Sequence, residues 1–230
     1  MKYRWAAECT RAIEMNNTDY VRKLIRAGAS PDMHDTNNLQ VAIKHQNFEL
    51  IDILCKNGAK LPAEWIQSKT ITLPESIARQ MDANIVLRIN RCLLNHRLRI
   101  VAACGDLSTL LQCQHLGADI NSENCYGSTA LLCSIQHGNY FLIVHALVSH
   151  GAIMLHSNEN QSMSLIALAK KHNYTQIVDY LSQELNTQFL ISIVNNDMRS
   201  AEKFGALGAD FMYQDEQKRT ALHYAVQYHG

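Results

Sequence analysis

The sequence lacks several features that would assign it to a common functional class. It has 21 Lys and Arg against 21 Asp and Glu, so no charge excess points to nucleic acid or an anionic membrane. No run of about 18 apolar residues is present, and we therefore expect no membrane insertion. The motifs Gly-x-Gly-x-x-Gly, Gly-Lys-Ser/Thr and His-Glu-x-x-His are also absent, which leaves no signal for a nucleotide or a metalloprotease site.

The cysteines do not indicate a disulfide framework or a metal site. The seven cysteines are scattered and include no Cys-x-x-Cys pair, which favours reduced thiols in the cytoplasm. Cys133 and His137 have a spacing that places two ligands on one helix face, but we expect Cys133 in the packed core and no metal or cofactor. Seven cysteines and eleven histidines yield Cys–His pairs by chance, so they do not indicate a nucleophile, and we expect no catalysis.

A short phrase recurs along the chain: two apolar helical stretches followed by Gly-Ala. The glycines of this step are Gly28, Gly58, Gly117, Gly151 and Gly208. The intervals between them are 30, 59, 34 and 57 residues, which are one or two steps of a period of about 30 residues. Such a period indicates an array of repeated units that pack on their neighbours instead of forming one globular core.

A second phrase links the array to a known family. Residues 129–134 (TALLCS) and 220–225 (TALHYA) stand where ankyrin repeats carry Thr-Pro-Leu-His-x-Ala, and residues 116–121 (LGADIN) and 126–129 (YGST) match that family most closely. The chain thus resembles the ankyrin-repeat family. The array is degenerate, because none of the three prolines lies in the Thr-Pro pair. The resemblance implies an all-α solenoid of helix-turn-helix units with short hairpin-like fingers, in which a left-handed glycine ends each second helix.

The apolar pattern divides residues 1–230, as a single domain, into about seven units and a terminal half-unit. We expect helices at 8–15, 20–26, 39–45, 48–56, 75–81, 84–94 and 220–228. An atypical third unit covers 62–97, where an extended entry segment holds Trp65 either as a structural plug or as a docking element. Units follow at 97–121, 123–154, 162–185 and 187–211. Because the eighth unit has only its first helix, we expect a longer parent protein or an unusual cap.

The resemblance implies that fingers and first helices contact a partner protein. Tyr126 is the strongest candidate, because aromatic residues are enriched in interface hot spots, although packing against the adjacent finger is an alternative. His45, His137 and His172 recur at the ends of first helices, either as a polar row on the concave face or as ordinary solvated helix ends. The full set is Met33, His34, Thr36, Lys44, His45, Cys125, Tyr126, Ser128, Gln136, His137, Asn160, Gln161, Met163, Lys171, His172, Glu216, Gln217 and Arg219.

From this resemblance we expect a non-catalytic, monomeric scaffold that binds another protein and no nucleic acid. The alternative is the targeting part of a larger enzyme. The low-proline, Asn-rich character is similar to that of ankyrin-repeat effectors that intracellular bacteria deliver into host cells, and such a role would place the protein in the host cytosol.

Overall fold

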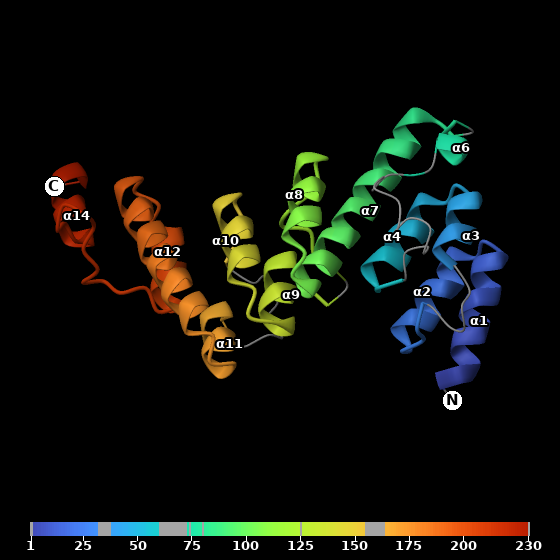
Figure 1. Cartoon of the computed structure of the whole chain (residues 1–230), viewed down its shortest axis with the longest axis horizontal. Coiled ribbons are helices and arrows are strands. Elements are labelled where there is room, and N and C mark those ends of the chain that lie inside the picture. The colour runs from blue at the N-terminus through green and yellow to red at the C-terminus, as the bar shows by residue number, and fades with distance from the viewer. Residues whose placement is uncertain are drawn as a thin grey trace.

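The computed structural model describes residues 2–31, 38–59, 73, 75–79, 81–124, 126–154 and 164–229. Every regular element in these ranges is an α-helix, which confirms the all-α class. Along the long axis the chain runs from α1 at one end to α14 at the other, so the two termini lie at opposite ends (Figure 1). They are α1 Lys2–Glu14, α2 Thr18–Arg26, α3 Asn38–Lys44, α4 Phe48–Lys56, α6 Glu75–Ala78, α7 Ala83–Cys104, α8 Leu107–His115, α9 Ala130–His137, α10 Phe141–Ser149, α11 Leu165–Lys171, α12 Thr175–Val194, α13 Met198–Ala206 and α14 Ala221–His229.

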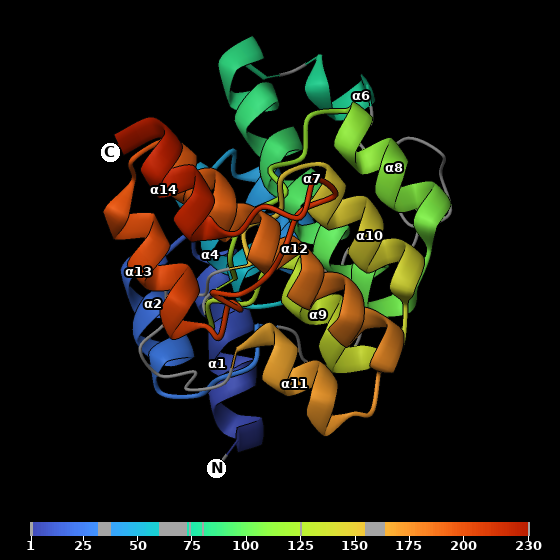
Figure 2. The same ribbon diagram turned by 90° about the vertical axis from the view of Figure 1, so that its left-hand side faces the viewer.

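The helices pack as sequential pairs, and the pairs stack on one another. Within pairs, α1 contacts α2, α3 contacts α4, and α9 contacts α10. Between pairs, first helices contact first helices, as α1 with α3 and α9 with α11. Second helices contact second helices, as α2 with α4 and α8 with α10. Figure 2, turned by 90°, shows α8 beside α10 and α9 beside α11. A pair that lies between two others therefore packs against both of them.

The Gly-Ala steps end the second helices, as the sequence predicts. All five glycines have φ between 79° and 96°, in the left-handed region. The amide of the following alanine then donates to the carbonyl five residues back, as Ala29 does to Leu24 and Ala118 does to Cys113, both at 3.0 Å. This is the Schellman arrangement, which satisfies carbonyl groups that the helix itself leaves unpaired.

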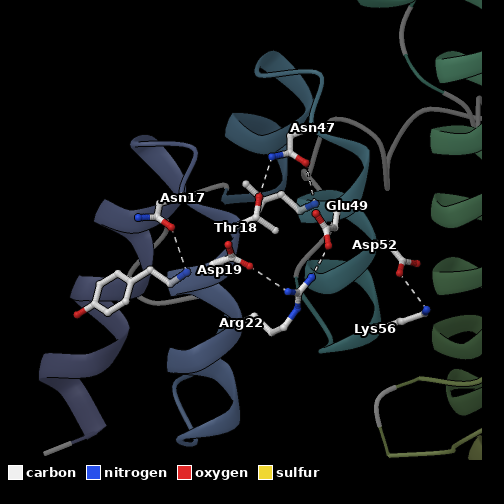
Figure 3. Close-up of polar contacts among 10 residues, drawn as sticks. Asn17, Thr18, Asp19, Arg22, Asn47, Glu49, Asp52 and Lys56 are labelled. Carbon is white, nitrogen blue, oxygen red and sulfur yellow. Dashed lines mark hydrogen bonds and ion pairs between the residues drawn. The ribbon is translucent and has the colours of Figure 1, made fainter.

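A related turn joins the two helices of most pairs. Asn16, Gln46, Asn173 and Asn196 have φ between 53° and 59°, so non-glycine residues adopt the left-handed conformation there. In three of these turns an Asn or Asp follows and caps the second helix. Its side chain accepts from an amide three residues on, as Asn17 does from Tyr20 and Asn47 does from Leu50 at 3.1 Å (Figure 3). Short polar side chains therefore both end one helix and begin the next.

Polar contacts also link consecutive turns. The Asn47 side-chain amide donates to the Thr18 hydroxyl and to the side-chain oxygen of Asn16, both at 2.8 Å. Beside it, Arg22 of α2 pairs with Asp19 of its own helix and with Glu49 of α4 (Figure 3). Exposed ion pairs contribute little to stability. The hydrogen bonds of the Asn47 side chain are therefore the more important link between the pair α1 and α2 and the pair α3 and α4.

Two helices are longer than one unit and belong to two pairs each. α7 runs without a break from Ala83 to Cys104, so the predicted helix end at Leu94 is wrong. The reason is local: no residue from 84 to 104 has positive φ, and the sequence offers no Gly-Ala step there. α12 is continuous from Thr175 to Val194 across the predicted boundary near residue 186. Both helices cross the row of helices obliquely (Figure 1).

The buried apolar residues form three clusters that meet on these long helices. The first includes Leu39, Leu54 and Ile89, the second includes Leu98, Leu131 and Leu181, and the third is Leu185, Phe189, Ala201 and Ala209. One boundary lies on α7 between Leu93 and Leu94, and the other lies on α12 between Leu181 and Leu185. Each long helix is therefore the shared wall of two cores. Trp65 and the predicted entry segment before residue 73 lie outside the described residues.

The left-handed caps can be tested at Gly117, where an added β-carbon would meet no atom within 4 Å and φ is +88°. We expect Gly117→Ala to lower the free energy of unfolding by about 1 kcal/mol, because the only cost is the left-handed backbone. Gly117→Asn is the control and should lose less, since asparagine tolerates this conformation. Urea unfolding followed by circular dichroism measures both, and equal losses would contradict the explanation.

The continuity of α7 can be tested at Arg97, in the middle of the region predicted to separate two helices. In a continuous helix Arg97→Pro removes a backbone hydrogen bond and clashes with the preceding turn, which costs about 3 kcal/mol. Arg97→Ala removes the side chain alone and is the matched control. The difference between the two unfolding free energies isolates the backbone effect. A difference close to zero would mean that α7 is broken at this point.

Candidate interaction surface

The described contact residues at the ends of the first helices are exposed. This holds for Lys44 and His45 at the end of α3, for Gln136 and His137 in α9, and for Lys171 and His172 at the end of α11. Met33, His34, Thr36, Cys125, Asn160, Gln161 and Met163 lie outside the described residues, so their predicted contacts stay predictions.

Two of the three histidines at the ends of first helices, His45 and His172, also make contacts within the chain. The Nε2 atom of His45 lies 3.1 Å from the carbonyl oxygen of Glu14, the last residue of α1. The end of α3 therefore lies beside the end of α1. The ring of His172 stacks on Tyr174, with centroids 5.4 Å apart and an angle of 16° between planes. Both histidines remain exposed, so each combines a structural contact with an accessible face.

Other residues stand at the same position in their pairs but are not among the predicted contacts. His45 lies two residues before the capping Asn47, and Met15, Cys104 and Asn195 stand in the same place before Asn17, Asp106 and Asp197. All three are exposed, Met15 at 72%. The signal that identifies them is the distance to the capping residue. The glycine period does not locate Cys104 and Asn195, because α7 and α12 cross the unit boundaries.

The finger around Asn124 separates two predicted contact residues. The Asn124 side-chain oxygen accepts from the amides of Tyr126 at 2.9 Å and Ser128 at 2.8 Å, and Gly127 between them has φ of 72°. This turn leaves Tyr126 70% exposed and Ser128 only 8% exposed. Tyr126 is thus available to a partner, whereas Ser128 closes the turn through its carbonyl oxygen, which accepts from the Asn124 amide.

The last finger repeats this turn with a charged residue. Asp215 accepts from the amides of Gln217 at 2.9 Å and Arg219 at 2.8 Å, while Lys218 takes the left-handed position with φ of 60°. The Tyr224 hydroxyl donates to the Asp215 carboxylate at 2.6 Å. That bond and the surrounding donors hold the pKa of Asp215 well below its usual value.

Arg219 is less available than the other residues of this finger. It forms an ion pair with Asp215 at 2.9 Å and lies over the Tyr224 ring, 4.6 Å from its centroid. Glu216 and Gln217 are exposed. Any partner of this finger would therefore meet Glu216 and Gln217 first and the Arg219 guanidinium edge second.

A pocket of about 290 Å³ lies where α7 passes the Gly58-Ala59 step. His96 and Arg99 line it, and each is about 5% exposed. The Arg99 guanidinium donates to the Ser122 hydroxyl at 3.1 Å. The Nε2 atom of His96 donates to the Ala59 carbonyl oxygen at 2.7 Å, and burial lowers the pKa of His96 to about 4. The histidine is therefore neutral near pH 7 and acts as a fixed donor.

A second pocket, of about 220 Å³, lies where α12 passes the Gly151-Ala152 step, beside Glu184 and Gln188. The two pockets thus share their position, because each adjoins a long helix. Cys55 and Cys133 also line the pocket beside α7. Burial raises the pKa of the Cys133 thiol, and a hydrogen bond with the Cys92 thiol raises the pKa of Cys55. Neither thiol has the low pKa of a nucleophilic cysteine.

Within the described ranges, no three His, Cys, Asp or Glu side chains come together as metal ligands. The helices described there include none with the length and hydrophobicity needed to span a membrane. Comparisons of the sequence with models of protein families and with curated proteins give no match.

The environment of His96 predicts how stability depends on pH. In the unfolded chain the imidazole binds a proton near pH 6.5, whereas in the folded chain it does so only near pH 4. Stability should therefore fall as pH decreases from 6.5 to 4, by up to about 3 kcal/mol from this residue.

Urea unfolding at pH 7 and pH 5 measures the effect. His96→Gln keeps a side-chain N–H and cannot titrate, so this variant should lose less stability between the two pH values than the wild-type chain. His137→Gln, at an exposed position, is the control and should behave like wild type. An unchanged pH dependence in His96→Gln would refute this role.

Proposed function

We propose that this chain is an ankyrin-type repeat solenoid of about seven units and a half-unit, and that it acts as a monomeric, non-catalytic scaffold binding another protein. The proposed contact surface consists of the finger turns and the ends of the first helices. Because no family model matches, the assignment to ankyrin repeats depends on the residue phrases together with the geometry of the helix pairs.

One observation supports the proposal most directly: the helix pairs are built alike, while the exposed residues at one position differ from pair to pair. In four of the pairs the position two residues before a capping Asn or Asp holds Met15, His45, Cys104 and Asn195, which differ in size and polarity. Most buried positions in the same first helices are apolar, as Leu39, Ile43, Leu98 and Ala102, and the buried polar residues Asn38, His96 and Arg99 make hydrogen bonds within the chain. Selection on packing explains the second set. The first set is what a recognition surface requires, because each unit then offers a different contact.

The chemistry of the described surface supports a partner surface that makes aromatic and polar contacts. Tyr126 offers a large amphipathic ring, and His137 and His172 offer imidazole nitrogens for hydrogen bonds. Lys44 and Lys171 add positive charge at the helix ends, while Glu216 adds negative charge at the last finger. Two positive charges and one negative charge leave these three residues with a net charge of only +1, so we expect affinity to depend on the rings more than on ionic strength.

The test is affinity capture with the chain of residues 1–230, identification of bound proteins by mass spectrometry, and measurement of affinity for the purified partner. The variant Tyr126→Ala, His137→Ala, His172→Ala should bind at least about tenfold more weakly, which corresponds to about 1.4 kcal/mol. The control variant Leu111→Ala, Leu142→Ala, Glu202→Ala changes exposed residues of second helices and should bind within about twofold of wild type.

Three outcomes would reject the proposal. The control variant could weaken binding as much as the first variant, which would move the interface to the second helices. Both variants could bind like wild type, which would exclude this surface. No protein could be captured at all, which would leave the chain without the expected activity. Circular dichroism of each variant establishes that the helices are retained.

A further inference from the structure

The pocket beside α7 combines a buried positive charge with mostly apolar walls. Its volume is about 290 Å³, and it lies where α7 passes between α4 and α9 (Figure 1). Ala59, Ile100 and Ala103 supply apolar wall, and Arg99 is 6% exposed. Among the described residues that line the pocket, none is Asp or Glu. This part of the wall therefore carries a positive charge and no negative one.

The charge of Arg99 reaches other polar groups of the pocket. Burial is the larger effect on the Cys133 thiol and raises its pKa, while the Arg99 charge acts to lower it. At His96, burial is again the larger effect and lowers the pKa, and the Arg99 charge lowers the pKa further. A group bound between these residues would meet the same positive potential. Such a potential attracts an anion most strongly where water is excluded.

The second long helix shows that the fold does not require this charge. The side chains of Asn95 in α7 and Asn186 in α12 each accept from an amide 24 residues on, so the two helices can be aligned on them. Arg99 and Leu190 each stand four residues further and occupy the same place. Leu190 is also 6% exposed, and the fingers that follow the two helices close with the same turn. Leucine is therefore sufficient at this place, and the cost of burying a guanidinium indicates a role beyond packing.

We propose that this pocket binds a small monocarboxylic acid with an apolar body. The Arg99 guanidinium pairs with the carboxylate, because its planar N–H groups match the two carboxylate oxygens. The apolar body packs against Ile100 and Ala103. The volume lies near the lower end of the range for small-molecule sites, which begins at about 300 Å³. The site does not depend on the proposed function, because none of its described lining residues is a proposed contact residue.

Phenylacetate is a suitable probe, and phenylacetamide, which has the same shape without the charge, is its matched control. Alkylation by iodoacetamide at pH 7, read for each cysteine of the full chain by mass spectrometry, reports occupancy. Cys133 lines the pocket and is partly exposed, whereas Cys104 is exposed, lies outside the described lining and serves as the internal reference.

A ligand of this size is expected to bind with a Kd of about 1 mM, so about 10 mM phenylacetate should slow alkylation of Cys133 at least about fivefold. Alkylation of Cys104 should be unchanged. Phenylacetamide lacks the charge and acetate lacks the apolar body, so each should slow Cys133 by less than about twofold at the same concentration.

Two variants of the chain test the pocket in different ways. Arg99→Gln removes the charge and should abolish the protection of Cys133. Because Arg99 also donates to Ser122, the second variant is Ala103→Phe, which fills the pocket, leaves Arg99 in place and should also abolish the protection. Arg91→Gln removes an exposed charge of the same helix and should keep the protection. Circular dichroism of each variant establishes that the helices are retained.

The proposal is overturned if phenylacetate does not protect Cys133, or if it slows Cys104 by the same factor. Equal protection by phenylacetamide would exclude the pairing of carboxylate and guanidinium, and equal protection by acetate would exclude the apolar contact. Protection that persists in Arg99→Gln or in Ala103→Phe would place the ligand outside this pocket. Loss of protection in Arg91→Gln as well would indicate a general effect of charge instead of a site.

Discussion

The layout of this protein depends on where the backbone can adopt a left-handed conformation. A helix leaves its last carbonyl groups without intrahelical donors, and a left-handed residue lets the following amides turn back to satisfy them. Gly28, Gly58, Gly117, Gly151 and Gly208 do this after second helices. Asn16 and Asn196 do the same after first helices, where a side chain is tolerated because it is short and polar. Stacked pairs follow from this placement.

Where the left-handed residue is missing, two pairs merge into one helix. The chain stays helical around Asn95 in α7 and around Asn186 in α12. Each of these asparagine side chains instead accepts a hydrogen bond from a later segment of the chain. Asn95 accepts from the Asp119 amide at 2.7 Å, and Asn186 accepts from the Asp210 amide at 2.8 Å, each 24 residues on. The same contact at the same spacing shows that the two merged helices are built alike, and each has a pocket on the side of the preceding Gly-Ala step.

Most of the helices could be predicted from the sequence, because their signals are local. The glycine period, the Asn or Asp caps and the apolar spacing identify α2 and α4 to within two residues at each end. The continuity of α7 could not be predicted, since Leu94, Asn95 and His96 are acceptable both inside a helix and at its end, and only the absence of a left-handed residue decides. Among the predicted contacts, Tyr126 is exposed and Ser128 is buried. The difference comes from the Asn124 turn and not from residue type.

The division of the buried residues into three clusters joined by α7 and α12 has a mechanical consequence. Clusters that meet only through side chains can slide past one another. Clusters that share one helix cannot be separated or twisted without breaking hydrogen bonds along that helix. α7 and α12 therefore act as rods that transmit rotation from one cluster to the next. A load applied at one end therefore moves neighbouring clusters together, with little change in the angle between them.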